Sequence, residues 1–276
     1  MGGFFVCSRS LLEEFAMEKE LHLRKDGSVL TVTLNRPLSH NAMTPAMVAG
    51  LTAVFQDVND RDDIRVVVLT GNGRSFCAGA DLSFMRAAAD FSFADNVSDG
   101  EAIFDLMAAV DQCRKPVVGR INGAVIGGGV GLVSCCDIVV AVERVKFSFS
   151  EVRLGILPAV ISPFVIAKIG SAHARELFLT GERFTAERAR EIGLVQHVVP
   201  EDSLDEKVAE RVSALLQGAP GAQTAGKELI QVVACQEKMA VREYAANLIA
   251  QCRASAEGRE GMSSFLEKRK PAWQEE

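Results

Sequence analysis

The segment Asn122-Gly-Ala-Val-Ile-Gly-Gly-Gly-Val-Gly-Leu132 is the most informative part of this sequence. It follows a run over 117–121 that predicts a strand, and it leads into a helical segment and a second strand over 138–142. Strand and helix alternate through the middle of the chain, which favours parallel βαβ units with right-handed crossovers. We therefore expect an α/β protein in which this glycine-dense turn opens a helix.

Towards the N-terminus, the pattern predicts a hairpin, a helix and a buried strand. Residues 21–25 and 29–35 flank Asp26-Gly27, and the second run alternates apolar residues with threonine, as a β-hairpin requires. Thr44-Pro45 predicts a helix start, with the threonine as N-cap and proline at the first helical position. The β-branched run 64–70 predicts a strand buried on both faces.

Towards the C-terminus, the strand signal ends near residue 200. A helix–helix–strand unit is predicted over 176–179, 186–192 and 195–199, and the segments beyond it are helical, over 204–216, 222–233 and 241–256. We divide the chain into a loose N-terminal extension, an α/β core and a C-terminal helical region, at residues 1–17, 18–200 and 201–276.

Composition excludes several classes of protein. The 276 residues are 48% hydrophobic and 24% charged, which is typical of a globular chain. The formal net charge of -6 and a single tight basic cluster at 268–270 argue against nucleic acid as a partner. The uncharged, glycine-rich stretch 121–136 is too short to span a membrane. Seven cysteines without metal-ligand spacing predict buried thiols, a reduced cytoplasmic location and no metal site.

Two turns and one acid are chemically suggestive. The turn Ser75-Phe-Cys-Ala-Gly-Ala-Asp-Leu82 and the turn 122–132 each present backbone N–H groups near a helix start, which suits an anion or a carbonyl oxygen that gains charge. The alternative is that both are tight packing points. Glu151 lies in an apolar neighbourhood, where burial would raise its pKa and suit it to proton transfer. The alternatives are a salt bridge to Arg153 or a helix cap.

Other familiar catalytic motifs are missing from the sequence. The glycines after residue 127 do not give the G-x-G-x-x-G pattern of a dinucleotide site, and no GxxxxGK[ST] phosphate loop occurs. The four histidines form no i,i+4 pair, and a G-x-S-x-G elbow is absent.

Taken in order, the motifs resemble the enoyl-CoA hydratase/isomerase (crotonase) superfamily from about residue 21 to the tail. They are Leu34-Asn-Arg-Pro37, Ala78-Gly-Ala-Asp-Leu82, the 122–129 turn, Cys136-Asp137, and Thr180-Gly181 with Gly193-Leu194. The resemblance implies a crotonase-like superhelix of ββα/βαβ turns with a C-terminal helical oligomerisation region. It also implies a homo-oligomer, either a trimer or a hexamer built as a dimer of trimers.

The resemblance also assigns roles to residues. The amides of Ala80 and Gly128 would form an oxyanion hole for the thioester carbonyl of an acyl-CoA, and Glu151 would handle the proton. Acyl-CoA is then the substrate, and no cofactor is expected. Contacts with the CoA thioester are assigned to Asn35, Arg36, Ala78, Asp81, Leu82, Ser83, Gly131, Phe265 and Lys268.

The sequence departs from the family's hydratases at one catalytic position. Those hydratases use two glutamates; the second matches Glu151, but Gly131 stands at the position of the first. A single acid suits a Δ3,Δ2-enoyl-CoA isomerase, whereas residues 128–132 and 150–163 look most like bacterial methylglutaconyl-CoA hydratases. We expect hydration of a methylglutaconyl-CoA-like substrate, in leucine degradation or fatty acid metabolism. The alternatives are the isomerase, an RNA-binding protein and a non-catalytic scaffold.

Overall fold

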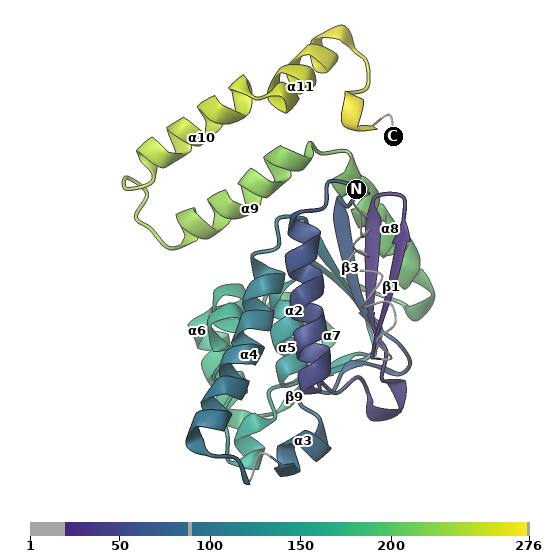
Figure 1. Cartoon of the computed structure of the whole chain (residues 1–276), viewed down its shortest axis with the longest axis vertical. Helices are drawn as coiled ribbons and strands as arrows, with labels where there is room; N and C mark the ends of the chain where they lie inside the picture. The colour runs from purple at the N-terminus through teal and green to yellow at the C-terminus, as the bar shows by residue number, and fades with distance from the viewer. Residues whose placement is uncertain (1–19, 88–89, 275–276) are drawn as a thin grey trace, which may run out of the picture.

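The computed structural model describes residues 20–87 and 90–274 (Figure 1). The expected extension, residues 1–17, lies outside these ranges. Six strands form the main sheet, in the order β1-β2-β3-β5-β7-β10. β1 and β2 are the antiparallel hairpin predicted around Asp26-Gly27, and the other neighbours are parallel. The strands are β1 (Leu21–Asp26), β2 (Val29–Leu34), β3 (Val66–Gly71), β5 (Val117–Ile121), β7 (Ile138–Val142) and β10 (His197–Val199).

The burial of each strand follows its position between layers. In β2, Leu30, Val32 and Leu34 are buried while the threonines between them are half-buried, as an alternating strand predicts. All six residues of β3 are buried, because helices pack near both faces of the sheet there. Figure 1 shows α2 (Pro45–Asn59) and α8 (Leu204–Leu216) on opposite sides of β3.

The helices that cover one face begin largely where the sequence predicts. The side chain of Thr44 accepts a hydrogen bond from the Met47 amide at 3.1 Å and caps α2. α4 (Phe93–Asp111), α5 (Gly128–Cys135) and α7 (Ala186–Glu191) follow along the chain. α6 spans Ser162–Thr180, so the predicted helix at 176–179 is only its last turn. The glycine-rich start of α5 leaves little periodic signal, and Gly170 breaks the pattern inside α6.

A second, four-stranded sheet was not predicted, because each of its strands has only three residues. Its order is β4-β6-β8-β9. The strands are β4 (Ser75–Cys77), β6 (Ala124–Ile126), β8 (Lys146–Ser148) and β9 (Arg183–Thr185). The parallel pairing of β4 with β6, and of β6 with β8, brings together the segments that follow these three strands. Those segments are α3 (Leu82–Ala87), α5 and the 3-10 turn η3 (Glu151–Leu154).

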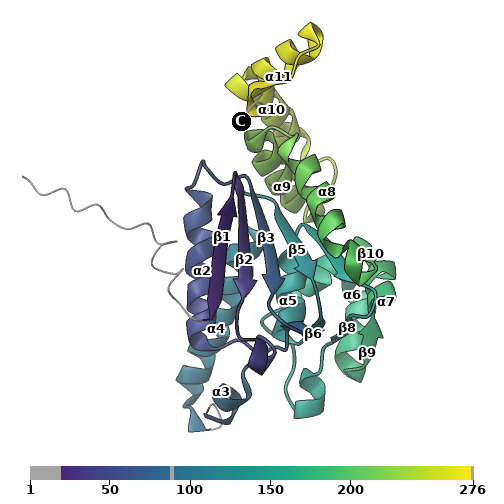
Figure 2. The same ribbon diagram turned by 90° about the vertical axis from the view of Figure 1, so that its right-hand side faces the viewer.

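Three helices form a C-terminal arm that extends from the core: α9 (Pro220–Ala234), α10 (Arg242–Ala254) and α11 (Ala256–Glu267) (Figures 1 and 2). The helix predicted over 241–256 corresponds to α10, and α11 is an additional helix. The Ser255 side chain caps α11 by accepting from the Gly258 amide. α9 is tied to the core by an ion pair between Lys227 and Asp137 at 2.7 Å.

The short elements and the thiols complete the description. Three further 3-10 turns are η1 (Pro37–Ser39), η4 (Glu201–Ser203) and η5 (Ala272–Gln274). Cys77, Cys113, Cys135 and Cys136 are buried as predicted, whereas Cys235 is exposed. Within residues 20–87 and 90–274, no helix combines the length and apolarity needed to cross a bilayer. The same part of the chain contains no group of three metal-ligating side chains.

Candidate active site

The two glycine turns singled out in the sequence meet in space. They follow the paired strands β4 and β6, and both contain a glycine with positive φ, Gly79 at +87° and Gly127 at +53°. A Cβ on Gly79 would lie 3.0 Å from the Ile126 carbonyl oxygen and 3.7 Å from the Gly128 nitrogen. A Cβ on Gly129 would lie 2.6 Å from the Cys77 carbonyl oxygen. Side chains at these positions would force the turns apart.

This close approach leaves two backbone amides available to a ligand. Met43 pairs with the first turn: its amide donates to the Gly79 carbonyl at 2.7 Å, and its carbonyl accepts from the Asp81 amide at 3.0 Å. The Ala80 amide between them has no hydrogen-bond partner among the described residues. The same is true of the amide of Gly128, the first residue of α5. Both residues line one cavity.

Glu151 lies beside the second turn. Its Oε1 is 3.1 Å from the place where a Cβ on Gly127 would lie, and its Oε2 is buried without a hydrogen-bond partner. Burial is the main cause that raises the pKa of the Glu151 carboxyl above its ordinary value. The described residues show no ion pair between it and Arg153, whose guanidinium faces the Thr180 carbonyl oxygen at 3.5 Å. Such an acid is suited to proton transfer.

The cavity that joins these groups has a volume of about 320 Å³. Glu151 is the only ionisable side chain on its wall among the described residues. Sequence reasoning missed the rest of the wall, although the apolar run at 154–161 was a signal for it. The apolar lining is contributed by Met43, Met85, Ile103, Ile126, Leu154, Ile156, Leu157, Pro158, Val160 and Ile161.

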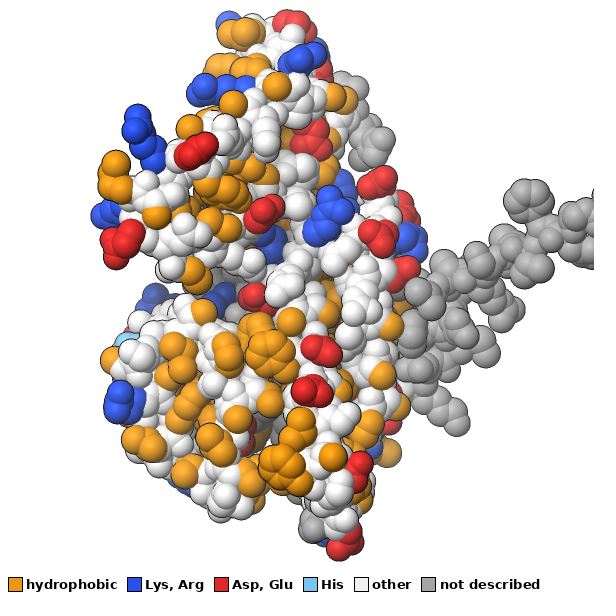
Figure 3. All heavy atoms as spheres, turned by 60° about the vertical axis from the view of Figure 1, so that its left-hand side comes forward, with side chains coloured by type: hydrophobic (Ala, Val, Ile, Leu, Met, Phe, Trp, Pro, Cys, Tyr) orange, Lys and Arg blue, Asp and Glu red, His pale blue; other side chains and the backbone are white. Residues whose placement is uncertain are grey.

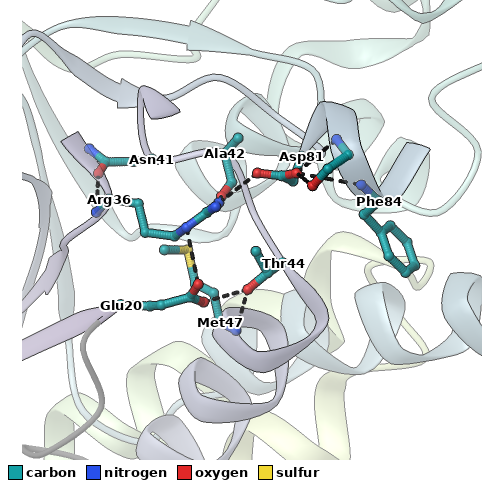
Figure 4. A network of polar contacts seen from close by, with 9 residues as sticks. Glu20, Arg36, Asn41, Ala42, Thr44, Met47, Asp81 and Phe84 are labelled. Atoms are coloured by element: carbon teal, nitrogen blue, oxygen red, sulfur yellow. Dashed lines mark hydrogen bonds and ion pairs between the residues drawn. The ribbon is translucent and has the colours of Figure 1, made fainter. Parts of the chain in front are cut away.

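Arg36 and Asp81 hold the first turn in place (Figure 4). Asp81 caps α3 by accepting from the Ser83 amide at 2.9 Å, and its second oxygen accepts from Arg36 Nη1 at 2.8 Å. Arg36 also donates to the Ala42 carbonyl at 2.5 Å and pairs with Glu20 at 3.1 Å. The Ser83 hydroxyl and Arg36 hold the pKa of the Asp81 carboxyl well below its usual range. Their contacts within the chain give both residues a clear structural role.

Of the other residues assigned to CoA contacts, four lie in or near the first turn, whereas Gly131 lies inside α5. Ala78 lines the cavity, Leu82 and Ser83 begin α3, and Asn35 accepts a hydrogen bond from Asn72 at 3.0 Å. Gly131 is buried in α5, where a Cβ would lie 2.5 Å from Ile161 Cγ2, so it is separated from the cavity by Ile161.

Phe265 and Lys268 are not brought to this cavity within one chain. Phe265 belongs to α11 and is 82% exposed, and Lys268 follows the end of that helix. Figure 1 shows α11 at the opposite end of the molecule from α3. Their assignment to the CoA site stays a prediction, and it would require a second copy of the chain.

Comparison with known proteins places this geometry in context. The family model described as enoyl-CoA hydratase/isomerase matches residues 24–276. The chain is 35% identical over 256 residues to the 2,3-dehydroadipyl-CoA hydratase of Escherichia coli, covering 91% of this chain and 97% of that protein. Among solved structures, an enoyl-CoA hydratase from Shewanella pealeana superposes with a TM-score of 0.91 at 34% identity, over 95% of this chain and 99% of that one. AtuE from Pseudomonas aeruginosa gives 0.90 at 38% identity, over 92% and 99%.

Proposed function

The chain belongs to the enoyl-CoA hydratase/isomerase family, and on that basis we propose that it adds water reversibly to a 2-enoyl-CoA thioester at the cavity beside Glu151. One observation carries the proposal: two backbone amides with no partner in the described part of the chain, and an acid whose Oε2 is buried, line the same apolar cavity. An α,β-unsaturated thioester needs these groups, because its carbonyl oxygen gains negative charge when water adds to the β carbon.

In the proposed reaction, the thioester oxygen accepts hydrogen bonds from the amides of Ala80 and Gly128. The water oxygen bonds to Cβ as the C=C π bond breaks, and the resulting enolate charge rests on the thioester oxygen. Protonated Glu151 gives its proton to Cα, and the proton lost by the water passes to the Glu151 carboxylate, which restores the acid. Loss of one oxyanion donor costs about 2.7–4 kcal/mol in comparable sites.

The substrate we favour is methylglutaconyl-CoA or a close analogue. Support comes from the sequence of residues 128–132 and 150–163 and from Gly131, which leaves the site with one acid. The carboxylate of such a substrate would help to position the water that a second glutamate holds in other hydratases. The reaction uses only the thioester and water, so no cofactor is proposed.

A second candidate is a Δ3,Δ2-enoyl-CoA isomerase, in which Glu151 removes a proton from one carbon and returns it to another. The observation that favours it is the wall of the cavity, which is mainly apolar and carries a single ionisable side chain among the described residues. An apolar site with one acid is sufficient for a proton shuttle.

Two measurements decide between these activities. Purified protein is given a panel of 2-enoyl-CoA thioesters, and loss of the conjugated enoyl absorbance reports hydration; a 3-enoyl-CoA that gains this absorbance reports isomerisation. The variant Glu151→Gln should lose about 10²–10⁴-fold in kcat, whereas Glu182→Gln, at an exposed position, should retain it. Near-normal turnover by Glu151→Gln would remove this residue from the proposed chemistry.

We also propose that the chain works as a homo-oligomer, a trimer or a dimer of trimers, in the cytoplasm. The C-terminal arm supports this, since α9 and α10 bury no residue within one chain. Figure 3 shows hydrophobic side chains on the surface of the arm and of the core. Ile230, Met239 and Phe265 are each at least 70% exposed. Sedimentation should give an oligomer that Ile230→Asp weakens; a wild-type monomer would contradict the proposal.

A further inference from the structure

Gly131 is enclosed by hydrocarbon on the side that faces the cavity. A Cβ built on it would lie 2.5 Å from Ile161 Cγ2, 2.9 Å from Ile161 Cβ and 3.1 Å from Met107 Sδ. Real Cβ atoms do not approach other heavy atoms at 2.5 Å, so the two side chains already fill the space that any side chain at position 131 would need.

Ile161 is also part of the cavity wall. It precedes α6 and is only 2% exposed, and it lines the cavity together with Val160 and Ile103. Val160 packs towards α4, because a Cβ on Gly100 would lie 3.5 Å from Val160 Cγ1. This part of the wall therefore consists of aliphatic groups held between two helices.

Ile161 packs against α5 at Gly131, three residues after the Gly128 amide to which the thioester is proposed to bind. Glu151 lies against Gly127, the available amide belongs to Gly128, and Ile161 lies over Gly131. Three residues of helix rise by about 4.5 Å. An acyl group anchored at the Gly128 amide and extending along α5 would bring its β carbon and one β substituent to Ile161.

We propose that Ile161 determines specificity by accepting an alkyl branch on the β carbon of the enoyl group. The proposal rests on the hydratase function above and deepens it, because it identifies β,β-disubstituted enoyl-CoA thioesters as the substrate class. A methyl branch at this place contacts hydrocarbon, whereas a polar branch would lose its hydration without gaining a partner. The second, larger β substituent extends towards the open rim formed by Leu154 and Leu157, which are 60% and 71% exposed.

The same packing explains why position 131 carries no acid. Gly131 and Ile161 share one volume, so a larger residue at the first requires a smaller one at the second. Gly131→Ala alone should push Ile161 into the cavity and weaken binding of branched acyl groups. The double variant Gly131→Ala with Ile161→Ala should recover the unfolding temperature that the single change loses.

The test compares two substrates in two variants, one at the cavity wall and one outside it. Crotonyl-CoA is unbranched, and 3-methylcrotonyl-CoA carries a β-methyl group. The ratio of their kcat/KM values should favour the branched substrate in the wild type and fall by about tenfold or more in Ile161→Ala, since one methylene in an apolar pocket is worth 10–200-fold. Leu179→Ala, which shortens a leucine that is 71% exposed and lies outside the cavity lining, should leave the ratio within about twofold.

A binding measurement separates this proposal from the proposed function. Calorimetry with the saturated thioesters butyryl-CoA and 3-methylbutyryl-CoA needs no turnover, and the preference for the branched ligand should fall in Ile161→Ala in parallel with the kinetic ratio. A wild type that hydrates neither these two enoyl-CoA thioesters nor methylglutaconyl-CoA overturns the proposed function, and the binding ratio then still decides the role of Ile161. Equal changes of the ratio in Ile161→Ala and Leu179→Ala, or no change in either, would overturn the specificity proposal.

Discussion

Replacement of Asp81 by alanine removes the group that connects the Ala80 turn to the rest of the core. One carboxylate oxygen caps α3 through the Ser83 amide at 2.9 Å, and the other accepts from Arg36 at 2.8 Å. The Asp81 side chain is 9% exposed and that of Arg36 is 20% exposed, so water replaces these contacts poorly. We expect Asp81→Ala both to destabilise the protein and to loosen the Ala80 amide.

The expected loss of stability follows from the two contacts. An N-cap contributes about 1 kcal/mol, and a hydrogen bond to a charged group about 1.5–3 kcal/mol, which gives a total loss of about 2–4 kcal/mol at neutral pH. Asp81 has a lowered pKa in the folded state, so its contribution is present above its ordinary pKa and is lost as the pH falls through the lowered value. The difference between the wild type and Asp81→Ala should therefore shrink under acid conditions.

Urea unfolding measures this loss, and Asp205→Ala is the matched control. Asp205 also pairs with an arginine, at 2.6 Å, but its side chain is 82% exposed and that of Arg120 is 26% exposed. Exposed pairs contribute about 0.2–1 kcal/mol, so the control should lose no more than that. We further expect kcat/KM to fall about tenfold in Asp81→Ala only. Equal losses of stability in the two variants, or a loss below about 1 kcal/mol in Asp81→Ala, would refute the reasoning.

Three other predictions concern strain, titration and thiol reactivity. Gly127→Ala and Gly27→Ala both place alanine at positive φ, +53° and +54°, and each should cost about 1–3 kcal/mol in unfolding free energy. Only the first position lies against Glu151, the proposed catalytic acid, so kcat/KM should fall about 10–100-fold in Gly127→Ala alone, and equal activities would contradict this. Because its pKa is raised, the folded protein favours protonated Glu151, and this contribution to stability is lost as the pH rises through the raised pKa. Glu151→Gln stays neutral, so its stability relative to the wild type should increase from pH 4 to pH 8 in urea titrations. Peptide mapping after thiol labelling should find Cys235 modified in the native protein and Cys77, whose pKa burial raises to about 12, modified only after unfolding.

Local patterns determined the hairpin, the parallel strands of the main sheet and most helix starts, because these depend on neighbouring residues. The alternation in β2 and the Thr44-Pro45 cap are examples. The same logic failed where elements are very short or lack periodicity. The three-residue strands of the second sheet are set by partners distant in sequence. The cap at Ser255 that starts α11 is local, and the sequence prediction missed it.

For the candidate active site, sequence alone identified two turns rich in glycine and one acid in an apolar setting. Whether the amides of Ala80 and Gly128 face one cavity depends on the pairing of β4 with β6, which joins segments about fifty residues apart in the chain. The pKa of Glu151 likewise depends on burial, which only the packed structure determines.

The clearest case is position 131. The sequence shows glycine where the resemblance leads one to expect an acid, but it cannot show what occupies the space. Tertiary packing decides that Ile161 and Met107, from two different segments, fill it with hydrocarbon. The reason is physical: chain order determines which groups are available, whereas close packing in three dimensions determines which of them can share a volume.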